Sequence, residues 1–233
     1  MKKDRTLRIV NIFCPINVAT IKSTYPMKRI EPIVNTLSQE RYKFGPKFQS
    51  DASNGYYVVP LWKEHAYKTA FSCSLGQFCY NVMGQGLSGA PYTYSRLKDL
   101  AMGCVPATKE ERSIQGVNDR PEGGSVAYKY FLDDDYGTAT DFMSLMWFLH
   151  ELYFPRLSWP RLTLKPTKTK FFSTSIGLLG YELNTGGLRP SIDKVGKIRD
   201  FSVPTNKKEL ESFLYMTLYL KRYIPGGPIM LIL

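Results

Sequence analysis

The chain has 233 residues, which is enough for one medium domain or two small ones with a sizeable hydrophobic core. Its 31 Lys and Arg residues outnumber its 20 Asp and Glu residues, and the formal net charge of +11 favours a polyanionic partner and excludes the acidic-tail proteins. Hydrophobic residues make up 43% of the chain and aromatic residues 14%, which excludes a disordered tail.

Neither a membrane span nor a secretion signal is predicted. The apolar tail at residues 229–233 is far shorter than the roughly 20 residues that cross a bilayer, and residues 1–10 are basic without an apolar core. The cysteines, at positions 14, 73, 79 and 104, show no C-x-x-C spacing that would bind zinc. We therefore expect free thiols and an intracellular protein that is not secreted, with cytoplasm, nucleus and organelle left open.

The first part of the chain contains four predicted elements. Residues 7–14 are typical of a buried strand, and residues 30–37 place apolar side chains at helical spacing. Residues 55–61 and 66–71 are rich in aromatic and β-branched residues, which favours two strands that pair as a hairpin.

The middle of the chain predicts a helix, a loop and a strand-turn-strand-helix unit. The helix covers residues 91–103 and ends at Gly103, and the polar residues 105–125 predict a long loop. The alternating residues 126–132 predict a strand, which an acidic turn joins to a second strand. An amphipathic helix follows at residues 141–153.

The last part returns to strand chemistry at residues 171–183, followed by a turn at residues 186–187. A final helix is predicted to begin at Asn206, with a Glu three residues on, and to end at Pro225. Strands and helices that do not alternate regularly indicate an α+β fold with an antiparallel sheet.

The acidic turn is the densest anomaly in the sequence. Asp133, Asp134 and Asp135 follow an apolar strand directly, and like charges this close repel one another unless a cation is present. Mg²⁺ prefers such oxygen ligands, although a solvated acidic turn explains the same run when it is taken alone. A third carboxylate at a strand end, Asp51, with Tyr56 five residues later, completes the carboxylate layout of a two-metal nucleotidyl transferase.

Short blocks around these residues match one family in order. DASNGY at 51–56 is similar to D-L-x-S-G-Y, VMGQGLSGAP at 82–91 to V-M-P-F-G-L-x-N-A-P, and FLDD at 131–134 to Y-x-D-D. With these blocks the chain resembles the reverse transcriptase domain of gypsy-type LTR retrotransposons, in the form found in fungal genomes. Four further blocks extend the resemblance: residues 2–8, 17–30, 68–71 (KTAF) and 178–181 (LLGY).

The resemblance implies a right-hand polymerase palm with an antiparallel sheet, truncated fingers and a partial thumb. It implies Asp51, Asp133 and Asp134 as ligands of two Mg²⁺ ions, with Mn²⁺ as a possible substitute. We match the Y-x-D-D motif to residues 131–134, starting at Phe131, because relatives have an aromatic residue at its first position. Asp135 then stands where relatives have an apolar residue, which could perturb the turn.

Substrate contacts are also implied. Arg8 and Lys2 would bind the triphosphate of a deoxynucleotide, and Tyr56 would exclude a 2′-hydroxyl, although by itself it is typical of a packed strand aromatic. Gln85 would lie beside the nucleotide, with an ordinary loop residue as the alternative. Lys168 would protonate pyrophosphate, with membership of a basic surface stripe as the alternative.

The C-terminal third would contact the primer and its template. Leu179, Gly180 and Tyr181 would form the primer grip, and the chain from Arg156 up to Glu182 contains basic residues but no acidic one, which favours phosphate contact. The implied parts are partial fingers (1–24), the first part of the palm (25–58), the second part of the fingers (59–89), the palm with loop 105–125 (90–188) and the start of the thumb or connection (189–233).

The sequence therefore predicts DNA synthesis on a primed RNA or DNA template from deoxynucleoside triphosphates, by a fragment of a longer polyprotein or a decaying genomic copy. One alternative is an inactive retrotransposon remnant that only binds nucleic acid. Another is a small metal-dependent phosphotransferase, against which the absence of a P-loop motif counts. The oligomeric state is not indicated.

Overall fold

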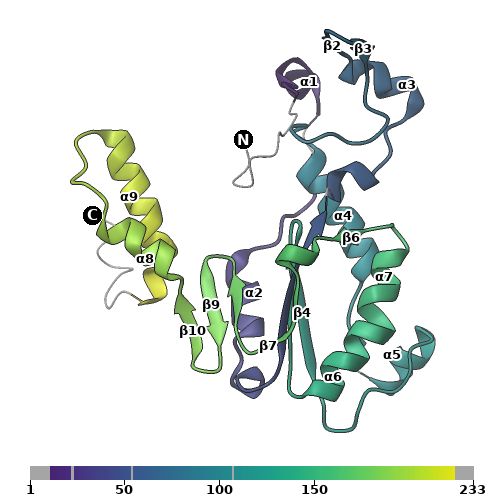
Figure 1. Ribbon diagram of the computed structural model, residues 1–233, viewed down its shortest axis with the longest axis vertical. Coiled ribbons are helices and arrows are strands. Elements are labelled where there is room, and N and C mark those ends of the chain that lie inside the picture. Colours follow the sequence, from purple (N-terminus) through teal and green to yellow (C-terminus); the bar gives the residue numbers. More distant parts are fainter. Residues whose placement is uncertain (1–10, 22–23, 54, 107, 224–233) are drawn as a thin grey trace.

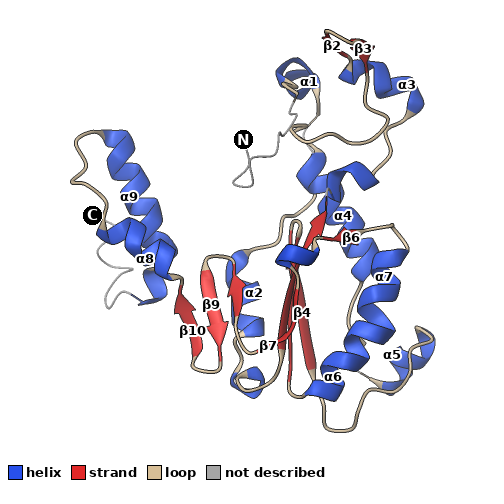
Figure 2. Ribbon diagram, viewed as in Figure 1, coloured by secondary structure: helices blue, strands red, loops and turns tan. Residues whose placement is uncertain are grey.

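The computed structural model describes residues 11–21, 24–53, 55–106 and 108–223, and its centre is an antiparallel sheet. Figures 1 and 2 show these strands side by side in the middle of the molecule. The order is β4–β5–β1–β6, and β7 pairs with the opposite end of β1 from β6. The bounds are Lys47–Ser53 for β1, Val126–Phe131 for β4, Asp134–Ala139 for β5, Thr163–Leu164 for β6 and Lys170–Ser173 for β7.

A hydrophobic core lies on each face of this sheet, because successive side chains of a strand point to opposite faces. Phe48 of β1 belongs to the first core, whereas Ala127 and Tyr136 of β4 and β5 belong to the second. The first core is completed by α4 (Ala90–Met102), α6 (Phe142–Trp147), a π-helical segment (Phe148–Tyr153) and α7 (Phe154–Ser158). The second is completed by α2 (Ile30–Leu37) and by a sheet of order β10–β9–β8, with bounds Gly187–Pro190, Tyr181–Asn184 and Ile176–Leu178.

Smaller groups of elements extend from this centre (Figure 1). Beyond one end of the sheet lie α1 (Cys14–Ala19), α3 (Lys63–Ala66) and the hairpin of β2 (Phe71–Cys73) and β3 (Gly76–Phe78). Beyond β10 lie α8 (Ile192–Arg199) and α9 (Lys207–Tyr219), and α5 (Lys109–Ile114) lies outside α6 and α7. Short 3₁₀ helices cover Glu40–Tyr42, Gly55–Val58, Tyr67–Thr69, Pro166–Lys168 and Lys221–Tyr223.

Most of the predicted elements are confirmed, including the α+β class and the strand, acidic turn, strand, helix order. Helix α2 has the predicted bounds, and α4 ends at Gly103, whose φ of 54° suits glycine. Asn206 begins α9 as predicted, since its side chain accepts a hydrogen bond of 3.0 Å from the Glu209 backbone N–H. None of the described helices has the length and apolarity that a bilayer crossing needs. All four cysteines are free and exposed, as expected.

The predicted hairpin of residues 55–61 and 66–71 is wrong, because this stretch consists of two 3₁₀ turns around α3. Its aromatic side chains pack onto a helix instead of across a strand pair: the rings of Tyr56 and Tyr94 meet edge to face with centroids 5.4 Å apart. A Cβ at Gly55 would lie 2.6 Å from the Tyr94 ring, so this close approach requires glycine.

Three further boundaries differ from the prediction. Residues 11–13 of the predicted strand 7–14 are irregular and α1 begins at the next residue, while residues 7–10 lie outside the described part. The predicted loop 105–125 contains α5, which a Thr108–Glu111 capping box begins. Residues 171–183 divide into three short strands, and α9 ends at Tyr219, before Pro225.

Candidate active site

Two adjacent strands bring the predicted carboxylates together. Asp51 near the end of β1 is the direct cross-strand partner of Asp134 at the start of β5. The backbone carbonyl of Asp133 accepts a 2.9 Å hydrogen bond from the N–H of Ala52, which extends the pairing by one residue. Asp51, which precedes Asp133 and Asp134 by 82 and 83 positions in sequence, therefore lies beside them at the end of the central sheet.

The turn between β4 and β5 is a tight hairpin. Phe131 pairs with Asp134, so only Leu132 and Asp133 form the connection. Leu132 has a φ of 52°, in the left-handed region that favours glycine at the first central position of such a turn. A leucine held in this conformation stores backbone strain next to a carboxylate, which is common at functional sites.

Asp51 is held by two ammonium groups. Lys165 Nζ lies 2.6 Å from Oδ1 and Lys168 Nζ lies 2.7 Å from Oδ2. Burial raises the pKa of Asp51, but the hydrogen bonds from both lysines outweigh it and bring the pKa below its usual value. The hydrogen bond to Asp51 in turn raises the pKa of Lys168.

Asp133 and Asp134 have the opposite electrostatic environment. Burial, followed by the charge of Asp51, raises the pKa of both carboxyls. Asp133 Oδ1 is buried and accepts no hydrogen bond from the described residues. One unsatisfied oxygen beside a second, mutually repelling carboxylate fits a hard divalent cation. Within the described ranges, however, no three His, Cys, Asp or Glu side chains are grouped closely enough to hold a metal ion.

An open cavity of about 500 Å³ lies at these strands and collects several of the predicted residues. Asp51, Asp134 and Lys168 line it together with Leu179 and Gly180 of the predicted primer grip. The acidic pair, the candidate proton donor and the tip of the second sheet thus face one space.

The primer-grip residues form the two-residue turn between β8 and β9. Leu179 and Gly180 both have positive φ, 49° and 82°, as a type I′ hairpin turn requires. Tyr181 is 7% exposed and does not line the cavity; its hydroxyl donates a 2.7 Å hydrogen bond to the Tyr219 carbonyl. Tyr181 therefore anchors the turn to α9, while its two neighbours face the cavity.

The other predicted substrate residues come from the N-terminal part of the chain. Tyr56 is half-buried beside the carboxylates, and burial, followed by the charge of Asp133, raises its pKa. Gln85 is half-buried in the loop before α4. The carbonyl of the next residue, Gly86, accepts a hydrogen bond from the Asn17 side chain. Arg8 and Lys2 lie outside the described residues.

Two features of the site were missed or misjudged from the sequence. Lys165 contacts Asp51, a role that the sequence predicts for neither Lys165 nor Lys168; these two lysines are three residues apart around the 3₁₀ turn Pro166–Lys168, which places them on the same side. Asp135 does not perturb the turn, because β4 and β5 pair in regular register and its side chain is fully buried against Lys98.

Comparison with solved structures identifies the architecture. The foamy viral protease-reverse transcriptase bound to double-stranded DNA has a TM-score of 0.76 at 19% identity, over 95% of this chain and 35% of that chain. The same viral protein with an RNA/DNA hybrid has a TM-score of 0.67 at 19% identity, over 90% of this chain and 25% of that chain. Residues 1–183 match the family described as reverse transcriptase (RNA-dependent DNA polymerase). The chain belongs to this reverse transcriptase family. The fold is the predicted polymerase palm, whereas the limits of its fingers and thumb stay predictions.

Retrotransposon polyproteins carry similar sequences. The Retrovirus-related Pol polyprotein from transposon opus of Drosophila melanogaster is 27% identical over 95% of this chain and 20% of its own length. The transposon Tf2-7 polyprotein of Schizosaccharomyces pombe is 24% identical over 96% of this chain and 15% of its own length. The chain thus spans a fifth or less of these relatives and corresponds to the reverse transcriptase domain within retrotransposon polyproteins.

Proposed function

We propose that the chain is the reverse transcriptase domain of a gypsy-type LTR retrotransposon of the fungal form, and that it extends a primer on an RNA or DNA template. The cross-strand pairing of Asp51 with Asp134, one residue from Asp133, carries the proposal. An open cavity with the basic side chain of Lys168 lies beside this carboxylate pair.

Asp51, Asp133 and Asp134 are the residues that would hold the divalent cations, Mg²⁺ or Mn²⁺. Two such ions supply a Lewis acid for the primer 3′-hydroxyl and for the leaving pyrophosphate. The buried, unpaired Oδ1 of Asp133 supports this assignment, as does the raised pKa of Asp133 and Asp134. Since Lys165 and Lys168 hold both oxygens of Asp51, metal binding would be coupled to release of these lysines.

The deoxynucleotide and the primer end would occupy the cavity beside this acidic group. Lys168 would then be free to hold or give a proton at the pyrophosphate oxygen, and the Leu179–Gly180 turn would support the primer. Tyr56 would exclude a 2′-hydroxyl, and Gln85 would lie beside the nucleotide. The solved foamy viral complexes contain double-stranded DNA or an RNA/DNA hybrid, which supports a primed template as the partner.

Primer extension tests the proposal directly. The purified chain is given a primed poly(rA) template, dTTP and Mg²⁺ or Mn²⁺, beside Asp133→Asn and the matched surface variant Asp119→Asn. We expect extension by the parent and by Asp119→Asn, and a loss of at least about 100-fold in Asp133→Asn because a metal ligand is removed. Equal extension by both variants would refute the site.

An inactive remnant that binds only nucleic acid is the second candidate. The observation in its favour is that the described acids form no ready metal-binding group. It predicts no extension by the parent, with unchanged duplex binding in Asp133→Asn. We also propose an intracellular location, because the four cysteines are unpaired and exposed.

A further inference from the structure

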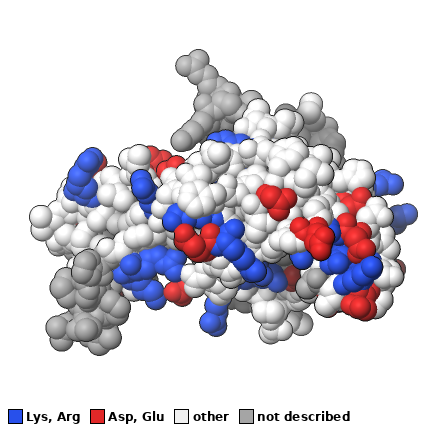
Figure 3. Space-filling model, turned by 90° about the horizontal axis from the view of Figure 1, so that it is seen from below, with Lys and Arg blue, Asp and Glu red and all other residues white. Residues whose placement is uncertain are grey.

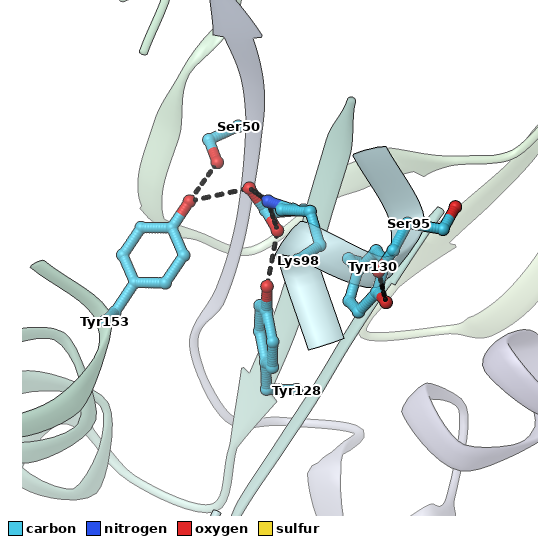
Figure 4. Close-up of polar contacts among 7 residues, drawn as sticks. Ser50, Ser95, Lys98, Tyr128, Tyr130 and Tyr153 are labelled. Carbon is cyan, nitrogen blue, oxygen red and sulfur yellow. Dashed lines mark hydrogen bonds and ion pairs between the residues drawn. The ribbon is translucent and has the colours of Figure 1, made fainter. Parts of the chain in front are cut away.

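A polar network around the buried side chains of Lys98, Asp135 and Tyr153 lies beneath the candidate metal site (Figure 4). The carboxylate of Asp135 accepts hydrogen bonds from Lys98 Nζ on both oxygens, at 2.6 and 2.7 Å. It also accepts from the hydroxyl of Tyr128 at 2.5 Å and from that of Tyr153 at 3.1 Å. Each carboxylate oxygen therefore accepts two hydrogen bonds, which fixes the orientation of the group.

This network also reaches the neighbouring strand. The hydroxyls of Ser50 and Tyr153 are hydrogen-bonded; because Tyr153 gives its single proton to Asp135, Ser50 is the donor to Tyr153. Figure 4 shows Ser50, Tyr153, Lys98 and Tyr128 converging from different elements. Tyr153 belongs to the π-helical segment, a local widening of a helix that is frequent at functional sites.

Through its hydroxyl, Tyr153 bridges Ser50 and Asp135, which lie next to the candidate metal ligands in the two strands. Ser50 and Asp135 are cross-strand partners, and Asp51 and Asp134 form the adjacent pair. Because side chains alternate along a strand, Ser50 and Asp135 point toward the helices while their neighbours point toward the cavity. Holding Ser50 and Asp135 in place on the helix-covered face therefore fixes the spacing of Asp51 and Asp134 on the cavity face.

Stability alone is a weak reason for such a network. A buried ion pair is often no more stabilising than well-packed apolar side chains of similar volume, because both charges must leave water. The surroundings would accept apolar groups, since Phe48, Phe148 and Leu152 form the same core. An interaction that gives little stability but sets the geometry of an adjacent site is better explained by positioning.

We propose that Ser50, Lys98, Asp135 and Tyr153 are positioning residues that hold Asp51 and Asp134 at the spacing needed to bind divalent cations. The inference rests on the proposed function for its biological meaning. Its physical content, that a hydrogen-bonded bridge on one face of the sheet sets metal affinity on the other, is independent of whether primer extension occurs.

Tyr153→Phe and Tyr128→Phe form a matched pair for the test. Each removes one hydroxyl that donates to Asp135, and each keeps a ring packed against Phe148, but only Tyr153 bridges to Ser50. Mg²⁺ affinity is measured as the rise in Tm with Mg²⁺ concentration, which needs no catalytic turnover. kcat and KM for dTTP on primed poly(rA) are measured in parallel.

We expect Tyr153→Phe to weaken Mg²⁺ binding by about tenfold and to lower kcat with little change in KM, whereas Tyr128→Phe stays within about twofold of the parent. Ser50→Ala should reproduce Tyr153→Phe, and the double variant should be no worse than either single variant. Equal effects of the two tyrosine variants on Mg²⁺ affinity would overturn the proposal, and so would a parent whose Tm does not respond to Mg²⁺.

A second variant separates positioning from folding. Lys98→Met with Asp135→Leu, Tyr128→Phe and Tyr153→Phe replaces the ion pair and both donating hydroxyls by apolar groups, and we expect its Tm to approach that of the parent while Mg²⁺ affinity stays about tenfold weaker. Parental Mg²⁺ affinity in this variant would refute the positioning role. Intact metal binding in a parent that does not extend primers would count against the proposed function alone.

Discussion

At the scale of single residues, the site contains a buried carboxylate, Asp133, whose charge opposes the stability of the fold. Burial and the nearby Asp51 charge raise the pKa of Asp133, and its Oδ1 has no hydrogen-bond partner in the described chain. Asp135, two residues along, has the same chemistry but four hydrogen bonds. Neighbouring aspartates are therefore divided into one that is satisfied within the fold and one that is available to a cation.

This contrast predicts that Asp133→Asn stabilises the metal-free protein. Removing a buried, repelled charge should increase the free energy of unfolding by on the order of 1 kcal/mol at pH 7, as is common when a functional group is neutralised. The folded-state pKa of Asp133 is raised, so in the parent this carboxyl becomes protonated, and stops destabilising the fold, as the pH falls through that pKa. The stability gain of Asp133→Asn should therefore vanish as the pH approaches the unfolded-state pKa of about 3.9.

Thermal or urea unfolding in chelator between pH 7 and pH 4 measures the difference. Asp119→Asn, at an exposed position, serves as the control and should change little. An Asp133→Asn variant less stable than the parent at pH 7 would contradict the electrostatic account of the site.

At the scale of elements, the β8–β9 hairpin links the active-site cavity to α9. Its turn residue Gly180 has a φ of 82°, and a Cβ there would lie 3.0 Å from Lys194 Cε and 3.1 Å from the Tyr219 hydroxyl oxygen. The Tyr219 hydroxyl donates a hydrogen bond to the Leu179 carbonyl, and the rings of Tyr181 and Tyr219 stack with their centroids 5.2 Å apart. The turn and α9 therefore constrain each other.

Gly180→Ala should consequently destabilise the protein by about 1 kcal/mol or more, because an L side chain is strained at this φ. Gly196→Ala in α8 is the matched control: it has open space and no positive φ, so a gain of about 0.5–1 kcal/mol is expected from helix propensity. Urea denaturation gives both values. A Gly180→Ala variant as stable as the parent would show that the turn conformation is not required.

At the scale of the whole molecule, the net charge of +11 is spread unevenly. Figure 3 shows basic side chains across the face seen from below, with most of the acidic ones in its right half. Lys168 and Lys170 line the candidate active-site cavity, whereas helix α5, whose first residue is Lys109, lies outside α6 and α7 (Figure 1). The proposed duplex would thus meet Lys168 and Lys170 at the cavity.

Duplex binding should therefore weaken steeply with salt, and Lys170→Ala should reduce the slope of log affinity against log salt by about 1, the value for one lost phosphate contact. Lys109→Ala should leave the slope unchanged. Fluorescence anisotropy of a labelled primer–template over a salt series gives both slopes. Identical slopes for the two variants would place the duplex elsewhere on the molecule.

Much of the fold follows from local signals. Helices α2, α4 and α9 have clear apolar spacing, α4 ends at Gly103 and α9 begins at Asn206, and the β4–β5 hairpin is marked by its alternating strand and acidic turn. The stretch 55–71 was mispredicted because its aromatic residues favour strands locally, whereas packing of Tyr56 onto α4 selects 3₁₀ turns. Propensity is a weak signal wherever a tertiary contact competes with it.

The sequence by itself determined the fold class and the family and singled out the three carboxylates as candidate metal ligands, because these inferences depend on residue types in a fixed order along the chain. Only the tertiary structure decided the partner of each carboxylate. Asp51 meets Lys165 and Lys168 from more than a hundred residues away, and Asp135 of β5 meets Lys98 of helix α4. Such pairings depend on strand register and on which face a side chain takes, and both are set when distant elements pack.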